Sequence, residues 1–297
     1  MKSYITYPIV EEHEGLTVEV YLKQILEYSG RKIQKLTRQK GIILNKKPVF
    51  LQKRVKTGDI LRVLTLEDSS YGVEPEQGLV DVLYEDKYLI VLNKPSGLLV
   101  HPAGQTSRGT LSNYLAHYYQ QQGVVCTARP IHRLDRETSG CVLFAKDSHT
   151  QAQLDKGLKE GTLKRTYQAV VHGIMHPSSG TIIAPIGPHL TKPNRRAVNQ
   201  KGDEAITHYT TLQSFSEASL LELSLDTGRT HQIRVHLSHS GHPIIGDRMY
   251  GKGSTLIAGQ TLHAVSLEFP HPVEQRKIIA VAPFPSSFLR VLESLSN

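Results

Sequence analysis

The chain has 297 residues, of which 39% are hydrophobic and 21% are charged, values ordinary for a globular protein. No run approaches the roughly 18 apolar residues of a membrane span, and the first residues lack the apolar core of a secretory signal. Lys and Arg number 35 against 27 Asp and Glu, giving a net charge of +8 that favours a polyanionic partner such as nucleic acid.

Cysteine usage indicates the compartment. Cys126 and Cys141 are the only cysteines in the sequence, and neither belongs to a Cys-x-x-Cys pattern. Two cysteines are too few for a disulfide framework, so we expect a protein of the reducing cytoplasm.

The first basic segment runs from Arg31 to Thr57 and contains no Asp or Glu. Ser29 is expected to cap a helix that begins near Arg31 and ends at Gly41. Ile33 and Leu36 lie three apart and share one face of that helix, and basic side chains line another. An earlier helix, at about 17–28, is expected to supply the same small core with Leu22, Ile25 and Leu26. Strands are expected at Ile42–Leu44 and Ile60–Leu64, with a turn at Asn45–Pro48.

Two helices on a short hairpin, one of them basic, could grip the RNA backbone, because each Lys or Arg on a phosphate releases counterions. The alternative is a solvated charged face. The pattern of Ser29–Leu36, Gly41, Asn45–Val49 and Val55–Ile60 resembles the alpha-L RNA-binding domain of the ribosomal-protein-S-four type. The expected RNA contacts on the basic helix are Arg31, Lys32, Lys35 and Arg38.

Residues 67–78 mix Ser, Gly and Pro with acidic residues and show no apolar periodicity, which is typical of a linker. We therefore predict an RNA-binding domain at 1–66, a linker at 67–78 and a larger domain at 79–297. Strands in the larger domain are predicted at Val80–Tyr84, Leu89–Asn93, Cys141–Lys146, Lys164–Val171, Ala205–Leu212 and Leu220–Leu225, and helices at 110–121 and Ser148–Glu160. Strand and helix do not alternate strictly, so we expect an α+β fold with a mixed, largely antiparallel sheet flanked by helices.

Three stretches could carry chemistry. In Ile131–Gly140, Asp135 lies between arginines in a loop that enters an apolar strand, and guanidinium charge would favour its ionised form. The alternative is an ordinary surface ion pair. In Asp226–Leu237, Gly228 permits a tight turn, Thr230 could cap a helix, and Arg229 could hold a carboxylate with its planar fork. The alternative is that Arg229 only ties down a loop.

The third stretch is Lys164–Ala169, where Tyr167 at the start of a strand could stack on a flipped base. Most strand tyrosines only pack, so alone this means little. Together, His132–Asp135, Thr138–Gly140, Lys164-x-x-Tyr167 and Gly228–Arg234 resemble the signature motifs of the RluA family of pseudouridine synthases. Further matching segments are Tyr84–Asp86, Asn93–Leu98, Val100–Pro102, Gly241–Asp247 and Leu262–Ala264, so the resemblance spans about Asp81 to Leu292. With its N-terminal module the chain is similar to the large-subunit ribosomal RNA synthase D subgroup.

The resemblance implies an isomerase that breaks the N1–C1′ bond of a flipped uridine in RNA and rejoins the base through C5, with no metal or organic cofactor. Asp135 would be the catalytic carboxylate, Arg229 its ion-pair partner and Tyr167 the base-stacking residue. Arg133 would fill the space that the base leaves. Other substrate contacts implied are His132, Ile233 and Leu262. Whether Asp135 acts as nucleophile or base stays open.

One segment departs from the family. Within 185–207, Asn194–Val198 and Lys201–Glu204 replace the usual basic patterns, which puts the choice of target in doubt but not the reaction. A metal site at His231, His236, His239 and His242 is disfavoured, because no Cys or Glu joins the cluster. The serious alternative function is a non-catalytic RNA-binding or ribosome-assembly protein. We expect ribosomal RNA or a pre-ribosomal particle as partner, no membrane, and a monomer.

Overall fold

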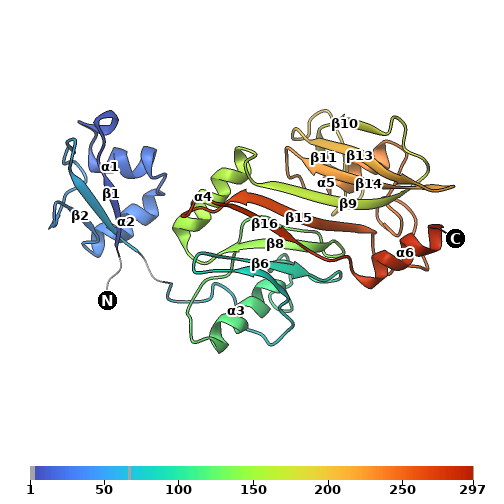
Figure 1. The fold of residues 1–297 in the computed structure, drawn as a ribbon, viewed down its shortest axis with the longest axis horizontal. Helices are drawn as coiled ribbons and strands as arrows, with labels where there is room; N and C mark the ends of the chain where they lie inside the picture. Colours follow the sequence, from blue (N-terminus) through green and yellow to red (C-terminus); the bar gives the residue numbers. More distant parts are fainter. Residues whose placement is uncertain (1–3, 66–67, 297) are drawn as a thin grey trace. The chain divides into compact units, whose positions relative to one another are not determined.

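The computed structural model describes residues 4–65 and 68–296. The chain divides into two compact units, Met1–Asp68 and Ser69–Asn297, each with its own core (Figure 1). Within the described ranges, no helix is both long enough and apolar enough to cross a membrane.

The first unit contains a four-stranded antiparallel sheet in the order β1-β4-β2-β3. The predicted strands at Ile42–Leu44 and Ile60–Leu64 are confirmed, and the sequence analysis missed the first strand. The strands are β1 (Tyr4–Pro8), β2 (Ile42–Leu44), β3 (Lys47–Pro48) and β4 (Ile60–Leu64). A short 3₁₀ turn, η1 (Glu11–His13), precedes the helices.

The helix expected at 17–28 is shorter and wider than an α-helix. Thr17 caps α1 (Val18–Val20), which continues as a π-helical turn, η2 (Tyr21–Ile25). The amide of Leu26 donates to the carbonyl of Tyr21, five residues back. Leu22 and Leu26 are buried as predicted, but the placement of Ile25 in the core was wrong, because the wide turn leaves it 39% exposed.

The basic helix is α2 (Gly30–Arg38), and its predicted start is confirmed: the Ser29 hydroxyl accepts a hydrogen bond from the amide of Lys32 at 3.3 Å. Ile33 and Leu36 are buried on its inner face. The chain leaves the helix through Lys40, whose φ of 51° is left-handed. Three basic side chains of this helix are exposed: Arg31, Lys35 and Arg38.

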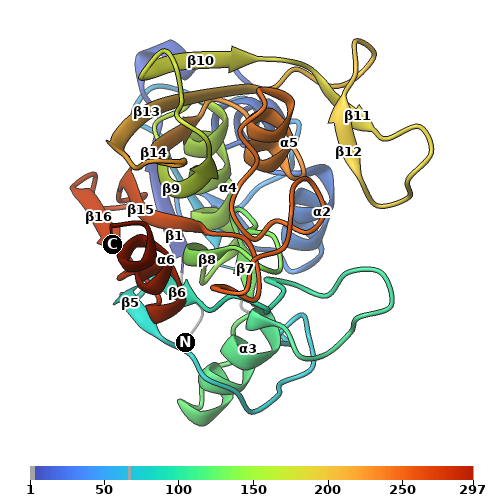
Figure 2. The same ribbon diagram turned by 90° about the vertical axis from the view of Figure 1, so that its right-hand side faces the viewer.

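The second unit is built on a long mixed sheet in the order β10-β13-β14-β9-β15-β8-β6-β5, with β16 paired to β15 and β7 to β8 (Figure 2). Apart from the parallel pair β15 and β8, its pairings are antiparallel, which confirms the predicted fold class. Its strands are β5 (Val82–Glu85), β6 (Leu89–Lys94), β7 (Arg129–Pro130), β8 (Ser139–Ala145), β9 (Lys164–His172), β10 (Ser179–Ile183), β13 (Ile206–Ser214), β14 (Ala218–Leu225), β15 (Leu262–Pro270) and β16 (Lys277–Val281). A separate two-stranded ribbon consists of β11 (Ile186–Pro188) and β12 (Arg196–Val198).

Both faces of the long sheet are covered, which follows from the alternation of side chains along each strand. On one face Leu92 and Phe144 pack with residues of α3 (Leu111–Gln121) and α5 (Gln232–His239). On the other face Leu143 packs near α4 (Ser148–Lys159), and Leu220 packs near α6 (Ser286–Ser296). Strand β8 is therefore buried along its whole length.

Part of the segment expected to be a linker belongs to the second unit. The carbonyl of Ser70 accepts a hydrogen bond from the Thr127 hydroxyl, and the carbonyl of Tyr71 accepts one from the Ala128 amide. Tyr71 also packs against the main core. These contacts fix the path of the chain well before the first strand of the sheet.

Gly140 is the glycine that the sheet most clearly requires. It lies in β8 with φ of +111°, and its register partner is Ala264 in β15. A Cβ atom at Gly140 would lie against the backbone carbonyl of Ala264. A side chain at this position would push β8, which follows the Asp135 loop, away from its neighbour β15.

We expect Gly140→Ala to lower the free energy of unfolding by about 3–5 kcal/mol, since it adds a backbone clash to a left-handed φ. Gly241→Ala is the matched control, because its φ is +84° and no atom lies within 4 Å of the added Cβ. That control should cost about 1–2 kcal/mol. Urea unfolding followed by circular dichroism checks both, and equal losses would contradict the clash.

Candidate active site

Asp135 lies in the loop between β7 and β8, and backbone hydrogen bonds fix the shape of this loop. The amide of Thr138 donates to the carbonyl of Asp135 at 3.1 Å, which closes a tight turn. The next carbonyl, of Arg136, accepts from the Gly97 amide and from Lys94 Nζ, each at 2.9 Å. Leu134 is buried in the main core and anchors the other side of the turn.

Lys94 ties this loop to the end of β6. Its side chain is fully buried, and its ammonium donates to the carbonyls of Pro95, Leu98 and Arg136. Burial lowers the pKa of Lys94 to about 7, against the opposing charges of Glu137 and Asp135. Three carbonyl acceptors match the three N–H donors of an ammonium group, so the buried cation is fully hydrogen-bonded.

Arg234 in α5 joins two carboxylates. Its Nη1 donates to Asp135 Oδ2 at 3.0 Å, while its Nε and Nη2 donate to the two oxygens of Asp247 at 2.7 and 2.9 Å. The side chain of Asp247 is 1% exposed, that of Arg234 9% and that of Asp135 17%. Asp135 therefore keeps its Oδ1 atom turned toward the cleft while Arg234 holds Oδ2.

Asp247 and Arg234 stay charged, because the attraction between the two ions outweighs the cost of burying them. Burial alone would raise the pKa of Asp247, but hydrogen bonds and charge from Arg234 hold it below its ordinary value, helped by the amides of Tyr250 and Met249. Burial alone would lower the pKa of Arg234, but Asp247 and Asp135 hold it above its ordinary value. The guanidinium is a permanent cation at this position.

His231 faces the free oxygen of Asp135. Its Nε2 lies 3.9 Å from Asp135 Oδ1, and its Nδ1 lies 2.8 Å from the Tyr250 hydroxyl, which also accepts from the amide of Arg196. The Tyr250 proton then has Nδ1 as its acceptor, which leaves the Nε2 proton directed toward Asp135. Burial lowers the pKa of His231, although the charge of Asp135 opposes the shift. The histidine is a neutral hydrogen-bond donor at pH 7.

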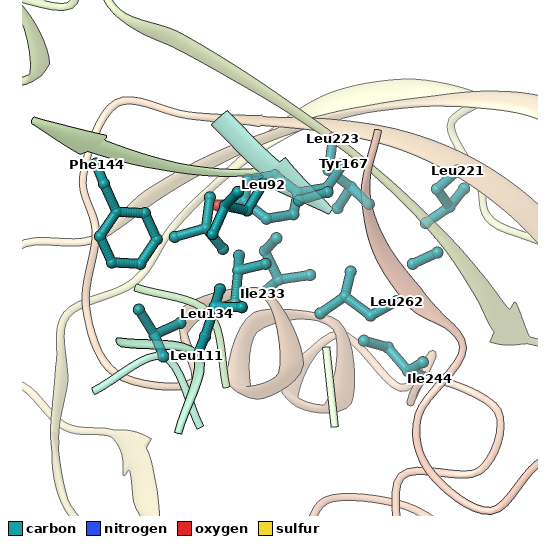
Figure 3. Close-up of a cluster of buried hydrophobic side chains, with 14 of the residues drawn as sticks. Leu92, Leu111, Leu134, Phe144, Tyr167, Leu221, Leu223, Ile233, Ile244 and Leu262 are labelled. Carbon is teal, nitrogen blue, oxygen red and sulfur yellow. The ribbon is translucent and has the colours of Figure 1, made fainter. Parts of the chain in front are cut away.

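The cleft above Asp135 has an apolar floor. Tyr167 on β9, Ile233 on α5 and Leu262 on β15 line it and are each at most 5% exposed. Figure 3 shows these three side chains in the same buried cluster as Leu134. Burial raises the pKa of Tyr167, which keeps its phenol protonated. The floor offers a flat aromatic ring and aliphatic surface to a planar ligand.

The role expected for Arg229 was wrong. Arg229 lines the cleft but is exposed, and its Nε donates to the carbonyl of Glu204 at 2.9 Å. Arg234, the third residue of α5, makes the ion pair with Asp135 instead and lines the same cleft. Thr230 does not cap that helix either: His231 occupies the cap position, with a left-handed φ of 61° and no capping side-chain bond.

Two other predicted residues lie at the margin of the cleft. Arg133 is exposed and lines both this cleft and a neighbouring groove that contains Leu99 and Pro130. His132 lines only that groove, is 8% exposed, and accepts a hydrogen bond from the Leu143 amide at its Nε2. His132 therefore supports the loop rather than the cleft. The remaining predicted contacts, in α2, belong to the first unit.

The sequence analysis missed several residues of the site. Arg234 was named only as part of a motif. Its position, third in the helix that follows Gly228, could have indicated that its side chain reaches the site. Asp247 was given no partner in the sequence prediction. It lies 13 positions from Arg234, and only the fold shows that the two side chains meet. His236 was weighed as a metal ligand, but its ring nitrogens contact Thr207 Oγ1 and the Ala184 carbonyl.

Comparisons with known proteins agree on one class. A family model described as RNA pseudouridylate synthase matches residues 88–239. An uncharacterized RNA pseudouridine synthase of Bacillus subtilis is 41% identical over 280 residues, covering 94% of this chain and 93% of its own. Ribosomal large subunit pseudouridine synthase D of Nitrosomonas europaea is 36% identical, covering 100% of this chain and 89% of its own. The solved structure of human RNA Pseudouridylate Synthase Domain Containing 4 covers 73% of this chain and 93% of its own, with 27% identity and a TM-score of 0.60.

His132 predicts a pH dependence of stability. Burial, helped by the charge of Arg165, lowers the pKa of His132 from 6.5 to about 3. Between these values the unfolded chain binds a proton at this position and the folded chain does not, so stability is present above pH 6.5 and is lost as the pH falls. We expect His132→Gln to reduce the slope between pH 6 and 4 by up to about 1.4 kcal/mol per pH unit. Urea unfolding across that range is the measurement, and an unchanged slope would mean that His132 takes up its proton in the folded state.

Proposed function

Because the chain belongs to the RNA pseudouridylate synthase family, we propose that Asp135 is the carboxylate with which it isomerises uridine to pseudouridine in RNA. The reaction breaks the N1–C1′ bond, turns the base, and forms a C5–C1′ bond, after which C5 loses its proton and N1 gains one. The product contains the same atoms as the substrate. A carboxylate oxygen that can attack carbon or accept a proton is the group that this chemistry needs.

The observation that carries the proposal is the unequal environment of the two Asp135 oxygens. Oδ2 accepts from Arg234, while Oδ1 faces the cleft beside the neutral His231. Fixing one oxygen orients the other, which is how a carboxylate is prepared for one reaction without a reorganisation cost. Oδ1 is therefore the atom that we assign to the reaction.

The shape of the cleft supports a flipped uridine. The glycosidic bond of a stacked nucleotide is out of reach, so the nucleotide must leave the helix. Tyr167, Ile233 and Leu262 offer the base a ring and two aliphatic side chains. Arg133, which is exposed and lines the cleft, would occupy the gap in the RNA. His132 is not part of this proposal, because it is buried beside the neighbouring groove.

We propose large-subunit ribosomal RNA as the substrate. The support is the relative named ribosomal large subunit pseudouridine synthase D, which this chain matches over its whole length, and the excess of basic residues in the sequence. The first unit would act as the RNA-binding domain at 1–66, through the exposed side chains of α2. Two free buried cysteines agree with a cytoplasmic protein, and we propose that it works as a monomer.

We expect Asp135→Ala to abolish pseudouridine formation while leaving RNA affinity within a few-fold, because the carboxylate acts on the target nucleoside and not on the RNA phosphates. The substrate is the ribosomal RNA of a strain that lacks the gene, and the readout is carbodiimide-induced stops in reverse transcription.

Arg234→Gln should reduce the rate by about 100-fold or more, since it releases Asp135 Oδ2 and leaves Asp247 unpaired.

Arg229→Gln serves as the matched control, because it removes a guanidinium from the same cleft without touching Asp135. Its loss should stay below about 10-fold, equivalent to about 1.4 kcal/mol. A wild-type protein that adds no stops to free ribosomal RNA or to assembly intermediates, yet binds both, would instead favour a non-catalytic assembly factor.

The first unit gives a separate prediction for binding. Replacing Arg31, Lys35 and Arg38 with Gln should weaken RNA binding and reduce the slope of log affinity against log salt by about 2, since each lost phosphate contact removes about 0.7–0.9. The control replaces three exposed basic residues of the second unit: Lys159, Lys252 and Arg290. Equal slopes for the two triple variants, measured by filter binding over a salt series, would show that α2 is only a solvated charged face.

A further inference from the structure

Arg165 is a cation of the cleft for which the reaction described above has no use. It lies on β9 two residues before Tyr167, so both side chains leave the same face of the strand. It lines the cleft together with Asp135, Gly228 and Arg229. The residue is half-buried, unlike Lys164 beside it, which is exposed.

Arg234 and Lys94 are bonded within the site, whereas the half-buried Arg165 has no carboxylate partner among the described residues. Arg234 is bound by two carboxylates, and the ammonium of Lys94 is bound by three carbonyls. Across residues 4–65 and 68–296, no acidic side chain forms an ion pair with Arg165. Its Nε is buried without a hydrogen-bond partner, and its Nη2 has only a long contact of 3.4 Å to the Thr227 carbonyl.

The surroundings of Arg165 leave its charge uncompensated. His132 is neutral, because burial and the charge of Arg165 lower its pKa to about 3. Tyr167 is also neutral, because burial raises its pKa. A guanidinium withdrawn from water without a counter-charge loses solvation and gains little in return. Such an arrangement is expected where the counter-charge arrives with a ligand.

The ligand chemistry follows from what a flipped nucleotide carries. Its uracil and ribose are neutral, and its negative charge lies on the two phosphates that flank it. A planar guanidinium fork matches phosphate oxygens. Gly228 lines the cleft beside the guanidinium, and a Cβ added there would lie only 3.3 Å from Arg165 Nη1. We propose that Arg165 binds a phosphate directly flanking the target uridine and so fixes its ribose against Asp135.

This inference rests on the proposed function, since it assigns a part of the same cleft. Arg165 acts as a positioning residue: it holds the phosphate, and the phosphate holds the ribose carbon near Asp135 Oδ1. The phosphate contact forms in the bound state and persists through the reaction. Its loss should therefore weaken substrate binding and also slow the chemical step, because a misplaced ribose reacts slowly.

The test is a cycle that changes the protein and the RNA in turn. Wild type and Arg165→Ala are compared on synthetic RNA that carries a uridine found by the mapping above, with either natural phosphates or one uncharged methylphosphonate directly 5′ or 3′ of it. We expect Arg165→Ala to lose about 30- to 300-fold on natural RNA under single-turnover conditions. One of the two methylphosphonates should replace the phosphate that Arg165 binds. On that RNA the rate of Arg165→Ala should be less than about 3-fold below the rate of wild type.

Arg165→Lys keeps the charge and should recover part of the rate on natural RNA, while Lys164→Ala is the control on the same strand and should match wild type. Thermal melting confirms that each variant is folded. Losses that multiply on both modified RNAs would overturn the phosphate assignment, as would a Lys variant no better than Ala. Conversion of natural RNA by the wild type keeps the proposed function standing in either case.

Discussion

The bridge that Arg234 makes between Asp135 and Asp247 is the interaction on which the site depends. Asp247 is almost wholly buried and accepts both remaining donors of the fork, so the guanidinium has one orientation. A guanidinium fixed in this way directs Nη1 toward Asp135 Oδ2. By fixing the guanidinium, Asp247 determines that Oδ2 of Asp135 is bonded and that Oδ1 is free. A lysine at 234 could not do this, because a point charge has no fork to share between two partners.

The fold brings these groups together from distant segments. Asp135 follows β7, Arg234 begins α5, and Asp247 lies in the loop beyond that helix. Because β8, β15 and β9 are neighbours in the sheet, the loop that enters β8 lies beside the start of β15 and the ring of Tyr167 on β9. Lys94 and Gly97 at the end of β6 then fix the backbone beside Asp135. The Asp135 loop is thus held by hydrogen bonds from the end of β6 and lies beside strands of the sheet.

Sequence reasoning found what local patterns encode. The cap at Ser29, the paired apolar residues of α2 and the strands β6, β8 and β14 follow from spacing that a few neighbouring residues set. It failed where a contact depends on the fold. Arg229 and Arg234 stand five residues apart in one motif and both line the cleft, but the chain turns at the left-handed His231 between them and Arg234 alone bonds Asp135. Ile25 was wrongly predicted to be buried for the same reason, because hydrophobic periodicity does not distinguish a π-helical turn from an α-helical one.

The charge states of the cleft follow from burial acting in opposite directions on acids and bases. Burial raises the pKa of Tyr167 and lowers that of His231, so both groups beside Asp135 stay neutral near pH 7. Within the described residues, Asp135 is the one carboxylate that lines the cleft, and Tyr167 and His231 beside it are neutral hydrogen-bond donors. A second proton acceptor beside the uracil ring would compete with Asp135 for the protons of the substrate. Neutral neighbours leave Asp135 Oδ1 as the one anionic oxygen that a nucleotide entering this cleft would meet.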